Sequence, residues 1–262
     1  WDTHGLPVEL EVEKLLKLDG KQDIEKYGIE PFIKKCKESV WKYKSEWETF
    51  TERVAYWVDM DNPYITYDNN YIESIWWALK KIYDKGLLYK GHKIVPYCPR
   101  CGTSLSSHEV AQGYKDVKET SIFVKFKSAE EQNTYFIAWT TTPWTLPSNV
   151  SLCLNPKENY AKISYQGDNY IMAENLVSGL FGEGYSITDV KKGKQYENKK
   201  YIPLFDYAGD LEQQAFYITC DDFVTLSDGS GIVHIAPAFG EDDAKVGKRY
   251  NLPFVQLVDD RG

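Results

Sequence analysis

The stretch Gly231-Ile-Val-His-Ile-Ala-Pro-Ala-Phe-Gly-Glu-Asp-Asp243 decides how the second half of the chain folds. Its pattern predicts a short strand, a Pro/Gly turn and then a helix. Side chains alternate between the two faces of a strand, so His234 shares a face with Ile232 and Ala236. An imidazole among small and apolar groups shapes a pocket.

Acidic residues follow that turn. Glu241-Asp242-Asp243 fall in the first turn of the predicted helix Asp242–Arg249, where unpaired N–H groups and the helix dipole keep a carboxylate ionised. One interpretation is that these acids only cap the helix. The other is a fixed anion beside the imidazole, suited to a ligand that carries an ammonium group. A divalent metal site on Asp242 and Asp243 is a weaker hypothesis, since it lacks further carboxylates at suitable spacing.

A second informative stretch is Trp139-Thr-Thr-Thr-Pro-Trp-Thr-Leu-Pro-Ser-Asn149, which follows the strand signal Tyr135–Ala138. Three threonines in extended backbone place hydroxyl groups on both faces. The two prolines restrict the backbone around them. An ordinary strand that runs into a proline turn is one interpretation, but the surrounding tryptophans and the asparagine favour a rigid polar wall.

Three stretches together resemble the isoleucyl-tRNA synthetase family: Trp1-Asp-Thr-His-Gly-Leu-Pro-Val-Glu9, Thr140–Asn149 and Gly231–Asp243. They occur in that family's order and spacing, and they span the whole chain. The resemblance implies a fragment that begins after the first nucleotide-binding signature and ends before the Lys-Met-Ser-Lys-Ser signature. We therefore expect no amino-acid activation by this piece, with ATP and magnesium needed only by the full-length parent.

The predicted fold class is α+β, in two parts with a boundary near residues 114–120. Residues 1–114 pattern as a helical linking segment, with helices over 7–20, 31–54 and about 70–85. The last of these has an apolar face, expected in the core, of Ile75, Trp76, Leu79, Ile82 and Tyr83. Residues 115–262 carry many short strands, which predict a closed or nearly closed β-barrel. The resemblance identifies that barrel as the family's editing domain.

The resemblance also implies a substrate. A pocket for isoleucine cannot strongly reject valine, because one methylene is worth only about 1–3 kcal/mol, a limit for which these synthetases are themselves the usual illustration. The remedy is a second site that hydrolyses the smaller product. The expected substrate is thus the valyl ester of tRNA for isoleucine, with valyl-adenylate as a second candidate and no cofactor required.

The resemblance assigns roles to seven residues. The expected catalytic residues are Thr140, Thr141, Thr142 and Asp243. The expected substrate-binding residues are His234, Asn149 and Trp139. Asp243 would hold the substrate ammonium, and His234 would limit the side-chain pocket. The threonines would serve the terminal ribose and a water, Asn149 would support their loop, and Trp139 would pack near the adenosine.

Two alternatives remain open at this level. No covalent nucleophile is evident, so we expect catalysis by positioning of a water, while His234 as a general base is the competing mechanism. The competing function is a non-catalytic module that only docks the aminoacylated 3′ end of tRNA. The partners expected in either case are tRNA and the rest of the synthetase.

Cys98-Pro-Arg-Cys101 has the shape of half a zinc knuckle. A structural zinc needs four ligands, and the chain has only this one CxxC pair, so we expect an incomplete site that holds zinc weakly or not at all. His108 is a candidate third ligand. An independent zinc-ribbon module that binds RNA is disfavoured for the same reason.

Composition sets the broader limits. The 262 residues carry a net charge of −8, which argues against a stand-alone nucleic-acid binder. Five cysteines with only one CxxC indicate a reducing, cytoplasmic setting. No apolar run approaches the roughly 18 residues of a membrane span, so we expect no membrane contact.

Overall fold

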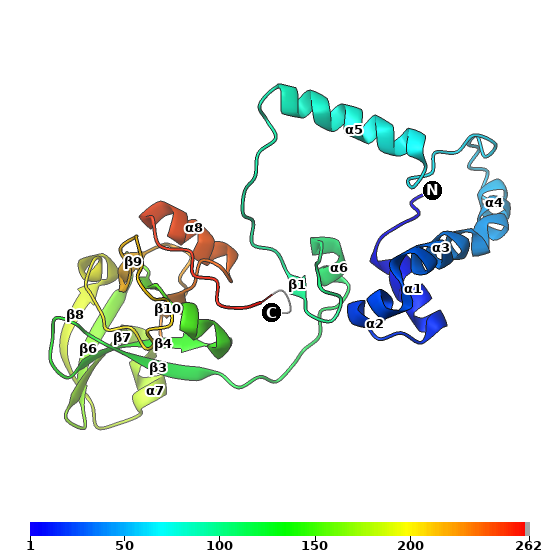
Figure 1. Cartoon of the computed structure of the whole chain (residues 1–262). Coiled ribbons are helices and arrows are strands. Elements are labelled where there is room, and N and C mark those ends of the chain that lie inside the picture. The colour runs from blue at the N-terminus through cyan, green and yellow to red at the C-terminus, as the bar shows by residue number, and fades with distance from the viewer. Residues whose placement is uncertain (260–262) are drawn as a thin grey trace. The chain divides into compact units, whose positions relative to one another are not determined.

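The computed structural model describes residues 1–259. The chain divides into two compact units. The elements of each unit can be found in Figure 1 by their labels and by the colour of their residue numbers. Among the described residues, one unit comprises 1–92 and 97–103, and the other comprises 93–96 and 104–259.

The first unit is helical. Its helices are α1 (Leu6–Leu16), α2 (Lys21–Tyr27), α3 (Ile29–Val40), α4 (Lys44–Arg53) and α5 (Asn69–Asp84), with a 3₁₀ turn η1 (Trp41–Tyr43) between α3 and α4. The single helix expected over 31–54 is therefore wrong. The break falls at Trp41, whose indole N–H donates to the hydroxyl of Tyr67 at 2.9 Å and whose ring packs edge-on against Trp1.

Helix α5 has the expected bounds but not the expected burial. None of its residues is buried, and Trp76 and Tyr83 are 67% and 65% exposed. The prediction that its apolar face lies in a core is thus wrong for the part of the chain that the structure describes. An amphipathic pattern identifies the apolar face of a helix, but it does not supply the surface that covers that face.

The CxxC segment forms a small hairpin. Strands β1 (Tyr97–Cys98) and β2 (Thr103–Ser104) pair around it, and helix α6 (Ser107–Ala111) follows. Ser106 and Glu109 close a capping box at the start of α6. Strand pairing begins at Tyr97, so residues 93–96 are not part of a strand.

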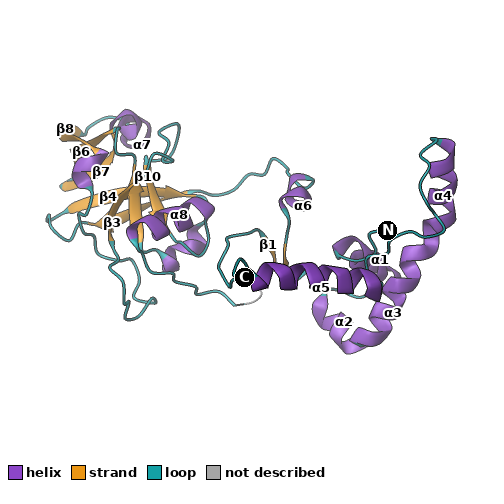
Figure 2. Cartoon of the chain, turned by 90° about the horizontal axis from the view of Figure 1, so that it is seen from above, coloured by secondary structure: helices purple, strands orange, loops and turns teal. Residues whose placement is uncertain are grey.

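The second unit contains two larger sheets (Figure 2). The five-stranded sheet has the order β3-β4-β7-β6-β8 and the three-stranded sheet has the order β10-β5-β9. Their strands are β3 (Ile122–Lys127), β4 (Thr134–Thr140), β5 (Ser151–Leu154), β6 (Asn159–Tyr165), β7 (Asp168–Ala173), β8 (Ser186–Lys192), β9 (Tyr217–Cys220) and β10 (Ile232–Ile235). The remaining elements are η2 (Pro143–Ser148), η3 (Glu174–Leu176), α7 (Val177–Phe181), η4 (Gly193–Tyr196) and α8 (Glu241–Tyr250).

Alternating side chains arrange these elements in layers. One face of the five-stranded sheet and one face of the three-stranded sheet share a core that includes Phe136, Leu152 and Ile232. The opposite face of the larger sheet packs with Val177 of α7, and the opposite face of the smaller sheet packs with Val246 of α8. Figures 1 and 2 show these two helices on different sides of the strands.

The expected closed β-barrel is not found among the described residues. In the second unit, Ser128 with Tyr201 and Lys200 with Tyr217 form single bridges outside the two sheets. The larger sheet ends at β3 and β8, and the smaller one at β10 and β9. Two open sheets that bury one face each against a common core satisfy the same alternating pattern as a barrel does. None of the described helices is long and apolar enough to cross a membrane.

Candidate functional site

The threonine run and the histidine motif meet at the inter-sheet core. Thr140 is the last residue of β4 and is buried, two residues beyond Ala138 on the face that lines this core. His234 lies on β10 two residues beyond Ile232, on the corresponding face of the smaller sheet, and is 6% exposed. The two faces of β10 contact different cores, since Ile232 packs in the inter-sheet core and Ile235 packs in the core on the α8 side, which agrees with the predicted alternation.

A chain of hydrogen bonds joins the two motifs. The backbone N–H of Thr142 donates to Oγ1 of Thr140 at 3.0 Å, and the two hydroxyls lie 3.3 Å apart. The hydroxyl of Thr145 donates to the carbonyl of Thr142 at 2.8 Å and lies 2.9 Å from Nε2 of His234. The threonine run thus reaches the imidazole through Thr145, a residue to which the sequence assigned no role.

His234 is held neutral. Burial lowers the pKa of its imidazole to about 4, because the charged form loses its hydration. Its Nδ1 is buried and has no hydrogen-bond partner among the described residues. At neutral pH this side chain is a rigid uncharged group and a weak base.

Asp243 lies in the first turn of α8, but it does not behave as a simple capping residue. Its Oδ2 accepts a hydrogen bond from the N–H of Ala236 at 2.9 Å, just beyond the end of β10. A Cβ on Gly240 would come within 2.8 Å of the Asp243 carboxyl carbon, so a glycine there allows the carboxylate to fold back.

Desolvation raises the pKa of Asp243 to about 6, against the opposing hydrogen bond from Ala236. Burial thus opposes ionisation at this helix N-terminus, although a carboxyl with a pKa of about 6 is still mostly ionised at neutral pH. No cation is paired with it among residues 1–259. Its neighbour Asp242 is exposed and pairs with Lys245 at 2.9 Å.

Both polar atoms of the Asn149 side chain form hydrogen bonds within the second unit. Its Nδ2 donates to the carbonyl of Ser151 at 2.8 Å, and its Oδ1 accepts from the hydroxyl of Tyr201 at 2.6 Å. Both Asn149 and Tyr201 are buried. The amide fixes the exit of η2, and the contact with Tyr201 could not be foreseen because 52 residues separate the partners.

The remaining expected residues differ in exposure. Thr141 and Trp139 are partly buried and Thr142 is exposed. The Trp139 ring packs so closely on Gly229 that a Cβ there would lie 2.8 Å from a ring carbon. Trp144 in η2 is 69% exposed, so it presents the larger free aromatic surface next to the threonine run.

The family model for tRNA synthetases class I (I, L, M and V) matches residues 1–231. This match covers most of the chain, including the N-terminal motif and the threonine run. The chain belongs to the class I tRNA synthetases.

Relatives of this synthetase chain are named isoleucine–tRNA ligase. The chain is 60% identical to the Clostridium acetobutylicum protein and 53% identical to the one from Bacillus thuringiensis strain Al Hakam, in each case over all 262 residues. It spans 25% of the length of each of these relatives.

Solved structures show a weaker likeness. The editing domain of the P. knowlesi cytosolic leucyl-tRNA synthetase aligns over 54% of this chain and 70% of its own, at 16% identity and a TM-score of 0.38. That of P. falciparum aligns over 45% and 47%, at 18% identity and a TM-score of 0.37. Scores this low do not establish a shared fold.

The CxxC hairpin carries two thiols, Cys98 and Cys101, that could bind a metal. The N–H of Cys101 donates to Sγ of Cys98 at 3.4 Å, and this hydrogen bond contributes most to a lowered pKa of the Cys98 thiol. No group of three or more His, Cys, Asp or Glu that could hold a metal occurs among residues 1–259. His108 instead contacts Gln112 at 2.8 Å. Cys98 and Cys101 are thus two candidate zinc ligands among the described residues, and the incomplete site stays a prediction.

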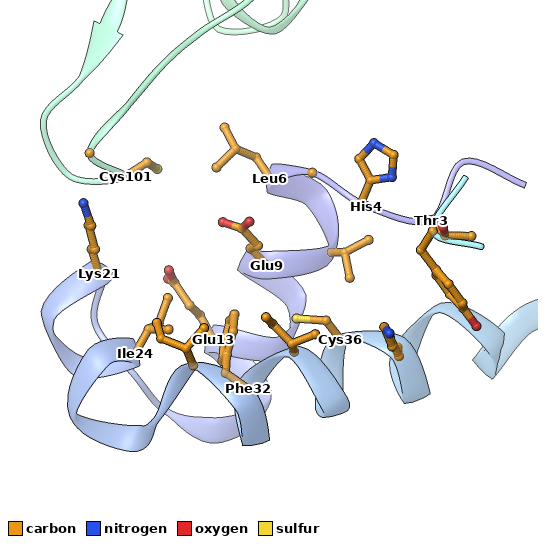
Figure 3. A pocket seen from close by; sticks show the side chains of 17 residues that line it. Thr3, His4, Leu6, Glu9, Glu13, Lys21, Ile24, Phe32, Cys36 and Cys101 are labelled. Atoms are coloured by element: carbon orange, nitrogen blue, oxygen red, sulfur yellow. The ribbon is translucent and has the colours of Figure 1, made fainter. Parts of the chain in front are cut away.

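A separate cavity of about 450 Å³ lies in the first unit (Figure 3). It is lined by residues of α2 and α3, by the Cys101–Gly102 turn, and by the N-terminal motif residues Thr3, His4, Gly5, Leu6, Val8 and Glu9. Thr66 anchors this motif through the N–H of Thr3 at 3.0 Å and Nδ1 of His4 at 2.9 Å. The N-terminal motif thus builds the wall of a pocket in the first unit.

Proposed function

We propose that the second unit is the editing site of an isoleucine–tRNA ligase. Its substrate would be the valyl ester of tRNA for isoleucine, with valyl-adenylate as a second candidate. The observation that carries this proposal is the carboxylate of Asp243, which is partly buried and has no cationic partner among residues 1–259. A buried carboxylate without a partner is costly, so such a group suits a ligand that brings its own cation.

The α-ammonium of an aminoacyl ester is a cation of this kind. It would form a charge-assisted hydrogen bond with the Oδ1 that the Ala236 N–H leaves free. Contact with an ammonium also favours the ionised carboxylate, which counters the desolvation that raises the pKa of Asp243 in the free protein. Binding would therefore be coupled to release of a proton from Asp243 near pH 6.

His234 would limit the size of the bound side chain. The imidazole is buried and neutral, and a base with a pKa of about 4 takes up a proton poorly at neutral pH. This favours a steric role over the competing general-base role. The valyl side chain would fit beside the ring, and the longer isoleucyl side chain would meet it.

The threonines would hold the ester and the attacking water. Thr142 is exposed at the end of β4, and its backbone is fixed by the hydroxyl of Thr140. Hydrolysis of an activated ester needs mainly a placed water and an oriented carbonyl. Thr140, Thr141 and Thr142 would supply these contacts, and Trp139 or the more exposed Trp144 would pack against the terminal adenosine.

The wider role follows from the relatives. They are named isoleucine–tRNA ligase and are about four times as long as this chain, which covers 25% of their length. We therefore propose that the parent protein joins isoleucine to its tRNA, with ATP and magnesium acting outside the residues described. The partners would be tRNA and the rest of the synthetase.

Two neighbouring acids give a matched test of the site. Asp243→Ala should slow hydrolysis of valyl-tRNA by about ten- to a hundredfold, because a charge-assisted contact is worth roughly 1.5–3 kcal/mol. Asp242→Ala removes an exposed first-turn acid that pairs with Lys245, and it should leave the rate within about twofold. Equal rates for both variants and the unaltered chain would refute the assignment. Binding of aminoacyl-tRNA without hydrolysis would support the docking module instead.

A further inference from the structure

The hydrogen bonds of the Thr145 hydroxyl indicate which ring nitrogen of His234 carries the proton. A threonine hydroxyl has one hydrogen, and that of Thr145 is donated to the carbonyl of Thr142 at 2.8 Å. Toward Nε2 of His234, at 2.9 Å, the same oxygen can therefore only accept. The proton of the neutral ring lies on Nε2, and Nδ1 is the unprotonated nitrogen.

The backbone around Thr145 makes this oxygen a fixed acceptor. The Thr145 N–H donates to the same Thr142 carbonyl at 3.1 Å, so η2 begins with a closed turn. At the other end of η2, the N–H of Val150 donates to the carbonyl of Ile235 at 3.0 Å, one residue beyond His234. Both ends of η2 are thus tied to the strands that carry the site.

The ring has no second anchor. Nδ1 of His234 is buried without a partner among the described residues, so the hydrogen bond to Thr145 is the only one described for this side chain. Without it, the imidazole could turn about its Cα–Cβ and Cβ–Cγ bonds. A group that limits pocket size must keep one orientation.

We propose that Thr145 is the positioning residue for His234: it fixes the ring as the Nε2–H tautomer in one orientation and thereby sets the limit that excludes isoleucine. The effect on isoleucine exclusion rests on the proposed editing function. The tautomer is inferred from the hydrogen bonds of Thr145 alone. Thr145 acts through His234 and needs no contact with the substrate.

The test compares Thr145→Val with Thr145→Ser. Valine keeps the volume and loses the acceptor, whereas serine keeps the hydroxyl. Thr188→Val is a matched control, since it removes a similar hydrogen bond, to the carbonyl of Lys162 at 3.0 Å, on the surface of the same unit. Thr145→Ala serves if the valine variant does not fold by circular dichroism.

The first readout is ¹⁵N NMR of the histidine rings at pH 7, where protonated and unprotonated ring nitrogens resonate in separate ranges. The chain has four histidines, and His234→Gln identifies the signals of His234. The unaltered chain, the serine variant and the control should show a single Nε2–H tautomer. Thr145→Val should show a mixture or the Nδ1–H form. A single unchanged Nε2–H signature in Thr145→Val would overturn the inference.

The second readout is the ratio of valyl-tRNA to isoleucyl-tRNA hydrolysis. It should fall about tenfold in Thr145→Val, mainly through a gain of isoleucyl-tRNA hydrolysis, and stay within about threefold in Thr145→Ser. An equal loss of the hydrolysis rate for both esters would show that Thr145 has a merely structural role, and it would overturn the claim that Thr145 sets the exclusion of isoleucine. If the unaltered chain hydrolyses neither ester, the editing function fails, while the NMR result still decides whether Thr145 sets the tautomer.

Discussion

Asp243→Asn should make the second unit more stable and at the same time inactive. The unaltered carboxyl has a pKa of about 6 in the folded chain against an ordinary value of 3.8, because burial removes its water. These values differ by about 2 pH units, and each unit corresponds to about 1.4 kcal/mol between the two protonation states. Ionised Asp243 thus destabilises the fold by up to about 3 kcal/mol. Asparagine keeps an acceptor for the Ala236 N–H and carries no charge.

The pH dependence gives the effect a distinct signature. Because the folded pKa is raised, the stabilising contribution of Asp243 is fully present below about pH 4 and is lost as the pH rises through about 6. The asparagine variant should therefore exceed the unaltered chain by about 2–3 kcal/mol at pH 8 and by almost nothing at pH 3.5.

Hydrogen exchange of the buried β4 and β10 amides in denaturant reports unfolding of this unit by itself. Asp242→Asn is the matched control, and it should change stability by less than about 0.5 kcal/mol because its carboxylate is exposed. Equal stability of Asp243→Asn and the unaltered chain at pH 8, or a gain that is the same at both pH values, would refute the desolvation argument.

Three further predictions test other parts of the site. His234→Ala should enlarge the pocket, so isoleucyl-tRNA hydrolysis should appear while valyl-tRNA hydrolysis survives; loss of both in a deacylation assay would instead indicate a general base. Tyr201→Phe should destabilise the second unit by about 1–2 kcal/mol in the same exchange measurement, because Oδ1 of buried Asn149 loses its donor. Tyr196→Phe is its control and should be neutral or stabilising, since that buried hydroxyl has no partner among the described residues. Metal analysis after dialysis should give clearly less than one zinc per chain, and a full equivalent would show that further groups complete the Cys98–Cys101 pair.

Local signals in the sequence predicted the elements that carry the site. Strand β4, Thr134–Thr140, contains the predicted strand signal Tyr135–Ala138, because an aromatic and β-branched run is a strong strand signal. Helix α8 spans Glu241–Tyr250, one residue longer at each end than predicted. The alternation over residues 232–236 separated the two faces of β10 correctly, although both faces are buried, in different cores.

Properties set by distant partners could not be predicted in this way. Strand β8, Ser186–Lys192, was missed because its polar and mostly exposed sequence becomes a strand only by pairing with β6. Asp243 has the sequence context of a capping residue, and only the packing around it shows that desolvation governs its pKa. Thr145 belongs to the stretch Trp139–Asn149, but its role depends on His234, 89 residues away.

The most direct test of the editing site is hydrolysis of two esters by the unaltered chain, with tRNA for isoleucine charged either with valine or with isoleucine. Initial deacylation rates are measured at pH 7.5, where Asp243 can ionise, and compared with spontaneous hydrolysis. The account predicts that the valyl ester is hydrolysed faster than the isoleucyl ester by at least about tenfold, the factor that one methylene against a fixed imidazole can supply. Equal rates for the two esters, or no rate above the spontaneous one for valyl-tRNA, would contradict it.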